Sequence, residues 1–375
     1  MTLPTFRAAL TGLACVVTLA ACGGEEDKPT GAIAVEAKDD ACAVTRTEAD
    51  AGTITFEVNN KGSQVTEFYL YAEGGRVMGE AENIEPGKSR RLNVEVSAGG
   101  KYQTACKPGM KGDGIRADFT VKGGAAKQAD GDAALAEATK GYHRYVVSQS
   151  DTLLVKTKEF VDAVKAAKVD EAKALFPVAR TYWERIEPVA ESFGDLDPRI
   201  DAREADLEPG AEFTGFHRLE KDLWVSGPQA DSAAIADRLM ADVTEVVDRS
   251  KKIELTPLQL ANGAKELLDE VATGKITGEE DIFSHTDLWD FRANVDGSQA
   301  AVAALRPIVE KKDPALAKTL DERFKAVDTL LEAQRDGSGF KSYDKLTESE
   351  IKAFAEAVDA LGEPISKVAD VVAAK

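Results

Sequence analysis

Histidine, cysteine and methionine are scarce in this chain of 375 residues, which has three, four and four of them. A blue-copper site takes two histidines, one cysteine and a weak methionine ligand. No histidine precedes His143, so the N-terminal third cannot form that site. Neither the His-Glu-x-x-His motif of zinc peptidases nor the Gly-x-Ser-x-Gly turn of serine hydrolases occurs. These absences argue against two common hydrolase classes.

Basic residues are also outnumbered. Lysine and arginine total 47 against 66 aspartates and glutamates, which gives a formal net charge of −19. A surface of this sign opposes binding to nucleic acid and mildly concentrates cations near the protein. We therefore expect no nucleic-acid partner, and the charge alone does not identify a metal.

The N-terminus carries the pattern of an export signal. Arg7 precedes a mostly apolar stretch at 8–20, which is too short for a membrane span, and LAAC followed by two glycines is typical of a lipoprotein signal. We predict a signal peptide at 1–21, a lipidated Cys22 and a tether at 22–30. The protein would be exported, and either anchored through Cys22 to the outer face of the cytoplasmic membrane or periplasmic. An ordinary secretory signal is the alternative.

Export and cleavage of the signal would change the number of cysteines that are available as thiols or for a disulfide. Cys15 leaves with the signal and Cys22 is modified, so Cys42 and Cys106 remain. Two remaining cysteines usually pair in an oxidising compartment. A metal-thiolate role for Cys106 is the alternative, and both interpretations stay open.

The chain changes character near residue 123. Residues 31–122 alternate apolar and polar positions, as in AIAVEA, TITFEV and RLNVEV, between turn signals, which predicts a β-sandwich. A small and flexible linker follows at 123–132. Residues 133–375 carry apolar side chains at helical spacing and predict an all-α bundle of six to eight helices without strands. The fold class is therefore multidomain, β followed by all-α.

His217 and Glu220, three residues apart in GFHRLEKDLW, are the strongest candidate site. If this segment is helical, both side chains leave the same face about one turn apart. One imidazole nitrogen and one carboxylate suit iron, zinc or copper and leave coordination positions for other ligands. Helical bundles build metal sites in this way, although the motif by itself is weakly specific.

Two acidic clusters could supply the other ligands. ARTYWERIEPVAESF places Glu184 and Glu187 at helical spacing, and Pro188 is expected to kink that helix and aim a carboxylate inward. FSHTDLWDFRAN places Asp287 and Asp290 beside His285. The spacing does not choose between the members of either pair.

The β-domain offers a second candidate site of different chemistry. Cys106 and Met110 in YQTACKPGM, with Glu67 in QVTEFYLY and Cys42, could hold copper, or iron through the harder donors. The alternative is a disulfide between Cys42 and Cys106, with Met110 in a loop.

The chain carries, in this order, the predicted lipoprotein signal, ACKPGM, the linker, YWERIEPVAESF, GFHRLEKDLW and SHTDLWDFRANVDG. This ordered set resembles the EfeO family of iron-uptake lipoproteins over essentially the whole mature chain. The helical half is similar to imelysin-like proteins. The resemblance implies a cupredoxin-like β-sandwich followed by an imelysin-like helical domain. It also implies a protein that binds iron outside the cytoplasm and passes it to a membrane iron permease, beside a secreted dye-decolorising haem peroxidase.

The resemblance also implies a ligand set. His217 and Glu220 match the family's His-x-x-Glu motif, and Glu184 and Asp287 match its acidic positions, with Glu187 and Asp290 as the competitors. Glu67 and Cys106 match a second site for copper or a second iron ion. We expect a binding protein and not an enzyme. The alternatives are a metal-dependent, peptidase-like hydrolase that uses the His-x-x-Glu pair, and a copper-assisted ferroxidase.

Overall fold

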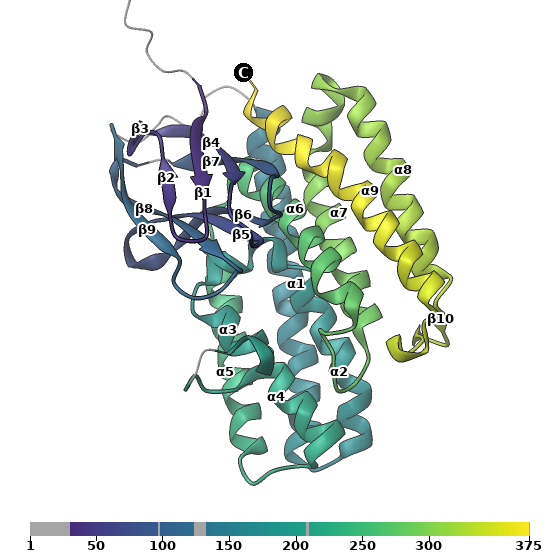
Figure 1. The fold of residues 1–375 in the computed structure, drawn as a ribbon. Helices are drawn as coiled ribbons and strands as arrows, with labels where there is room; N and C mark the ends of the chain where they lie inside the picture. The colour runs from purple at the N-terminus through teal and green to yellow at the C-terminus, as the bar shows by residue number, and fades with distance from the viewer. Residues whose placement is uncertain (1–30, 97, 124–132, 208–209, 375) are drawn as a thin grey trace, which may run out of the picture. The chain divides into compact units, whose positions relative to one another are not determined.

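All but two short strands come first along the chain, and the helices follow them (Figure 1). The computed structural model describes residues 31–96, 98–123, 133–207 and 210–374. Four predicted features lie wholly or mostly outside these residues: the signal at 1–21, the lipidation site Cys22, the tether at 22–30 and most of the linker at 123–132. The predicted fold class, a β-domain followed by an all-α domain, is confirmed.

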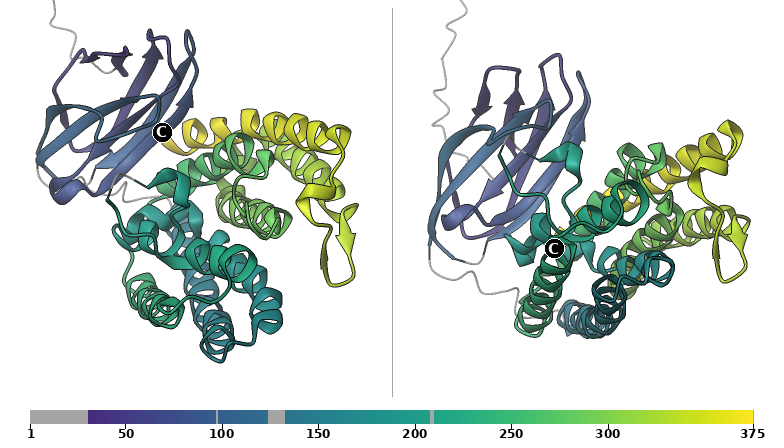
Figure 2. Two further views of the ribbon diagram at one scale, coloured as in Figure 1. Left: turned by 60° about the horizontal axis from the view of Figure 1, so that its bottom comes forward. Right: turned by 90° about the horizontal axis from the view of Figure 1, so that it is seen from below.

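Residues 33–122 form two sheets that face each other as the layers of a sandwich (Figure 2). One sheet has the order β2-β1-β4-β7 and the other β3-β9-β8-β5-β6. Alternation explains the layers, since Gly52–Asn60 buries every second side chain and presents the others outward. The strands are β1 (Ile33–Ala37), β2 (Cys42–Val44), β3 (Glu48–Asp50), β4 (Gly52–Asn60), β5 (Thr66–Tyr71), β6 (Val77–Ile84), β7 (Ser89–Val96), β8 (Gly100–Pro108) and β9 (Ile115–Lys122).

The described helical residues form nine α-helices, where the sequence predicted six to eight. They are α1 (Ala133–Lys165), α2 (Val169–Glu184), α3 (Leu196–Asp201), α4 (Gly215–Lys221), α5 (Ser232–Ser250), α6 (Pro257–Thr273), α7 (Asp287–Lys312), α8 (Pro314–Glu332) and α9 (Glu348–Ala373). A two-residue hairpin, β10 (Arg335–Asp336) and β11 (Gly339–Phe340), joins α8 to α9. The expectation of no strands was therefore wrong, because strands this short leave no alternation to detect. None of the described helices is long and apolar enough to span a bilayer.

The segment after α2 also differs from the prediction. Pro188 does not kink a continuous helix, because α2 ends at Glu184 and a separate 3₁₀ helix runs from Glu187 to Phe193. Proline lacks the N–H that would continue the α-helical hydrogen bonds. The 3₁₀ helix lies tightly against α6, since a Cβ added to Gly263 would be 1.9 Å from the Pro188 carbonyl oxygen. Only glycine permits this approach of backbone to backbone.

Residues 32–375 form one unit, in which α6 packs on the β-domain against β6 and β7, and α9 also contacts β7. The contact is polar. Arg90 pairs with Asp269, and Asn262 Nδ2 donates a hydrogen bond of 2.9 Å to the Asn93 carbonyl. A capping box, in which Thr256 and Gln259 each accept from the other's backbone N–H, starts α6.

Candidate metal centre

The His-x-x-Glu pair lies on α4 in the interior of the helical domain. His217 is 1% exposed and Glu220 is fully buried, and the Nδ1 of His217 is 3.1 Å from Glu220 Oε2. The helix starts at Gly215, whose φ is +77° and whose missing Cβ would lie 2.1 Å from the Ile200 carbonyl oxygen. Glycine is therefore required at the first position of the helix that carries the motif.

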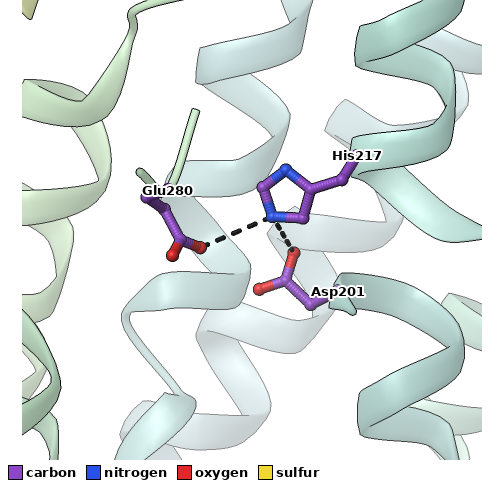
Figure 3. A group of neighbouring side chains, drawn as sticks. All are labelled: Asp201, His217 and Glu280. Carbon is purple, nitrogen blue, oxygen red and sulfur yellow. Dashed lines mark ion pairs between the residues drawn. The ribbon is translucent and has the colours of Figure 1, made fainter. Parts of the chain in front are cut away.

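The other ring nitrogen of His217 faces two carboxylates from different elements (Figure 3). Nε2 is 3.4 Å from Glu280 Oε1 and 3.6 Å from Asp201 Oδ1. Asp201 ends α3, and Glu280 lies in the loop before α7. Among the described residues Nε2 makes no hydrogen bond. One ligand atom of each residue lies within 4.8 Å of the others, a spacing that one metal ion could close with small movements, since bonds to nitrogen and oxygen are about 2.0–2.2 Å.

A second grouping uses the Nδ1 side of the same imidazole. His217, Glu220 and Asp281 also offer ligand atoms within 4.8 Å of one another, and Asp281 Oδ1 is 4.0 Å from Nδ1. Asp281 Oδ1 makes no hydrogen bond within the described part of the chain. One histidine therefore presents two alternative metal positions.

Two buried cations lie among these carboxylates. The Arg180 side chain is fully buried, and its guanidinium pairs with five acidic residues: Glu184, Asp201, Glu280, Asp281 and Asp290. Lys275 is also fully buried, and its ammonium is 2.6 Å from Glu184 and 3.1 Å from Glu187. Buried charge is tolerated only when it is paired and hydrogen-bonded, so Arg180 and Lys275 make this acidic interior stable.

The charges also control the protonation of the histidine. Burial and the positive charge of Arg180 lower the pKa of His217, but its contacts with the carboxylates of Glu220, Glu280 and Asp201 outweigh them and raise it to about 10. The imidazole is therefore a third internal cation in the metal-free protein at neutral pH. For Glu280, burial raises the pKa, yet Lys275, His217 and Arg180 together hold it well below its ordinary value.

The residues predicted from sequence occupy different places in this centre. Glu184 is fully buried and belongs to an acidic group with Glu187 and Asp201, next to the histidine group. Asp287 is in none of the ligand groups among the described residues; its Oδ1 accepts the backbone N–H of Asp281 at 3.1 Å. Its competitor Asp290 accepts a hydrogen bond of 2.8 Å from Arg180.

Asp201, Glu280 and Asp281 were not anticipated. All three lie at or beyond the end of a helix, where helical spacing says nothing about neighbours. The only signal in the sequence was the acidic run at 279–281, directly after Gly278. Gly278 has a φ of +76° and turns the chain at this point.

A cleft of about 570 Å³ leads to the centre from between the β-domain and the helices. Asp201 and Glu280 line it, and so do Glu187 and Glu270. From the β-domain and α6 it is lined by further residues, among them Tyr69, Glu80, Glu82, Lys107, Met110 and Glu266. The cleft therefore joins solvent to two of the residues that face His217.

The second predicted site, in the β-domain, is wrong in this fold. Cys106 forms a disulfide with Cys42, which consumes the thiolate that the site requires. Strand pairing also separates the residues, because Cys106 lies opposite Phe68 whereas Glu67 lies opposite Lys107. Neighbouring side chains on a strand point to opposite faces, so Cys106 faces the sandwich core and Glu67 faces outward. Of the two interpretations of the cysteines, the disulfide is the one found.

Glu67 instead belongs to the outer face of its sheet. It is 5% exposed and accepts a hydrogen bond of 3.0 Å from the Tyr69 hydroxyl. Burial raises its pKa, while Lys107 and the hydrogen bond from Tyr69 act in the opposite direction. Met110 is 38% exposed and lines the cleft.

Comparison with known proteins identifies the family. A model of the imelysin family matches residues 138–368, and a model of the cupredoxin-like domain matches residues 9–121. The iron uptake system component EfeO of Escherichia coli strain K12 is 39% identical over 346 residues, which cover 91% of each chain. The chain belongs to the EfeO family. The EfeO of Shigella flexneri matches with the same identity and coverage.

A solved structure supports the fold of the EfeO-family chain. A putative iron-regulated protein A precursor from Parabacteroides distasonis superposes with a TM-score of 0.51, covering 65% of this chain and 97% of its own. At 16% identity the likeness concerns the fold alone. The predicted pair of cupredoxin-like and imelysin-like domains is confirmed.

Proposed function

We propose that this protein is an exported, lipid-anchored iron-binding component of an iron-uptake system, which captures iron and delivers it to a membrane permease. The ion is held by His217 Nε2 together with Asp201 and Glu280. The observation that carries the proposal is a buried imidazole nitrogen without a hydrogen bond, facing two carboxylates at the inner end of an acidic cleft. EfeO relatives that align with nearly the whole chain are named as iron uptake components.

The ligand chemistry suits reversible capture. Carboxylate oxygens and one imidazole are donors that iron accepts in both of its common oxidation states. Arg180 contacts Asp201 and Glu280 directly, so an incoming ion competes with an internal cation for the same oxygens. That competition limits the affinity and favours release. Glu184, whose carboxylate also pairs with Arg180, adds negative charge beside the ion, and Asp287 holds the backbone of Asp281.

The remaining parts of the proposal concern location and partners. Lipid on Cys22 would keep the protein at the outer face of the membrane, where the permease takes up the released ion. A secreted dye-decolorising haem peroxidase is the further proposed partner. These assignments rest on the sequence pattern at the N-terminus and on membership of the EfeO family.

Metal titration of the mature protein tests the proposal. We expect one tight equivalent of Fe(II) under anaerobic conditions, or of Fe(III) supplied as citrate, and its loss in His217→Ala. His143→Ala is the matched control, because His143 makes a hydrogen bond of 2.9 Å with the Ser250 carbonyl, outside the centre. An unchanged stoichiometry in His217→Ala would refute this site.

A metal-dependent peptidase is the second candidate, because the imelysin family model also carries the designation peptidase M75. We expect the metal-loaded protein to leave peptide substrates intact. Cleavage that chelators abolish and that Glu280→Gln removes would replace transport with hydrolysis. The ferroxidase alternative required a Cys106 thiolate for copper, and the disulfide removes it.

A further inference from the structure

The glutamate of the His-x-x-Glu pair already has a full set of hydrogen bonds. One carboxylate oxygen of Glu220, Oε1, accepts the backbone N–H groups of Phe283 and Ser284 at 3.1 and 2.7 Å. The other, Oε2, is 3.1 Å from His217 Nδ1. Both oxygens of a fully buried carboxylate are therefore engaged by N–H groups. Coordination of an ion by Glu220 would disturb the contact with the histidine or the contact with the loop.

The other ring nitrogen of His217, Nε2, has no such hydrogen-bond partner in the part of the chain that the structure describes, and it is free to bind an ion. Nε2 makes no hydrogen bond among the described residues, and the two carboxylates within ion-pair range of it come from other elements. Histidines that bind metal through one ring nitrogen usually donate the N–H of the other to a carboxylate or a carbonyl. Glu220 lies where such an orienting carboxylate would lie, next to Nδ1, and an ion would then bind at Nε2.

Glu220 also connects two ligand-bearing segments. It sits on α4 with His217, while Phe283 and Ser284 belong to the loop that carries Glu280. Asp281 and Asp287 close the same loop through the backbone hydrogen bond already described. Glu220 therefore fixes the imidazole and the loop in one arrangement.

We propose that Glu220 is a positioning residue and not a metal ligand. It holds the proton on His217 Nδ1, directs Nε2 toward the ion, and ties the loop of Glu280 to α4. This inference rests on the proposed function, since it takes His217 as the residue that binds the ion. It assigns the second residue of the motif a different role from the first.

Cadmium NMR tests which nitrogen binds. Mature protein labelled with ¹⁵N-histidine and loaded with ¹¹³Cd²⁺ should show direct ¹⁵N–¹¹³Cd coupling at Nε2 of His217. The chain has only three histidines, so His143→Gln and His285→Gln assign the signals. Coupling at Nδ1 would overturn the inference and leave iron binding at His217 standing. Absence of coupling at His217 would sink both this inference and the proposed function.

Substitution distinguishes a ligand from a positioning residue. Glu220→Gln keeps one oxygen for the loop N–H groups but turns an amide N–H toward His217 Nδ1, so it should weaken Cd²⁺ binding while leaving the ¹¹³Cd shift of the loaded protein unchanged. Glu220→Ala should weaken binding about 10–100-fold, as expected for an outer partner of a ligand. It should also speed amide hydrogen exchange at Phe283 and Ser284 in the metal-free protein.

The matched ligand variant is Glu280→Gln, which should weaken binding and also move the ¹¹³Cd shift of the loaded protein, because it replaces a donor atom to the ion. Glu245→Gln, an exposed position on α5, controls for the change of charge, and circular dichroism establishes that each variant is folded. If Glu220→Gln moves the ¹¹³Cd shift of the loaded protein as far as Glu280→Gln does, then Glu220 is a ligand and the inference is wrong.

Discussion

At the residue scale, some side chains of the candidate metal centre could be predicted from the sequence and others could not. His217 and Glu220 could be found from sequence because three residues on a helix make about one turn. Asp201 and Glu280 could not, since they reach the histidine from separate segments. The error at Glu67 and Cys106 has a similar origin, because strand register decides which face a residue occupies and one residue of shift reverses it.

Replacing Arg180 should destabilise the metal-free protein, because the buried carboxylates around it would then repel one another without their shared cation. Arg180→Gln leaves five buried carboxylates without their shared partner, so the free energy of unfolding of the metal-free protein should fall by about 3–5 kcal/mol. Saturating Zn²⁺ should recover part of that loss, because a cation then replaces the guanidinium. Urea unfolding with and without Zn²⁺ measures both effects.

Arg306→Gln is the control for that experiment, since Arg306 pairs with Asp321 at the surface. It should change stability by less than about 1 kcal/mol. A metal-free Arg180→Gln protein as stable as the wild type would show that the carboxylates accept protons instead of needing the arginine.

At the element scale, the order of strands and helices could be predicted, whereas the short elements could not. Long periodic segments such as α1 and α9 leave a clear pattern of buried positions. By contrast α3 has six residues, too few for periodicity, and its position depends on packing against α4 and α5. The centre needs α3 because that helix ends at Asp201.

The start of α9 supplies a pH-dependent contribution to stability. Glu350 completes a capping box with Thr347, and hydrogen bonds from Thr347 lower the pKa of Glu350 from 4.5 to about 2. A carboxylate with a lowered pKa in the folded state stabilises the protein above pH 4.5, and this contribution is lost as the pH falls through 2. Wild type should therefore melt at a higher temperature than Glu350→Gln above about pH 5.

The same comparison should show the two melting temperatures converging as the pH is lowered from 5 toward 3. Differential scanning calorimetry across this range is the measurement. A difference that stays constant with pH would mean that the ionised carboxylate of Glu350 contributes nothing beyond the cap that glutamine also provides.

At the scale of the whole molecule, the β-domain contributes part of the cleft through which the proposed function requires metal to enter. Glu82 comes from the β-domain and Glu266 from α6, and both line the cleft. Burial and then neighbouring carboxylates, Glu80 among them, raise the pKa of both groups well above the ordinary value. Their crowding is relieved by any cation that enters, so the cleft favours cations over anions.

Charge reversal in the cleft should slow metal capture. Glu82→Lys and Glu266→Lys each place a positive charge on the path whatever the protonation of the wild-type side chain. We expect the association rate of Zn²⁺ in stopped-flow measurements to fall about tenfold at low salt, with a smaller effect at high salt. Glu356→Lys, on the exposed side of α9, changes the net charge equally and is the matched control. Equal rates in all three variants would exclude this cleft as the route.

The cross-link between Cys42 and Cys106 has a practical consequence. It leaves no reactive sulfhydryl among the described residues, so a single introduced cysteine can be labelled there without first removing native ones. Ile282 is a convenient position, being 53% exposed and next to Asp281. A fluorophore attached at Ile282→Cys would follow loading and unloading of the protein in real time, even when the cargo itself has no useful optical signal.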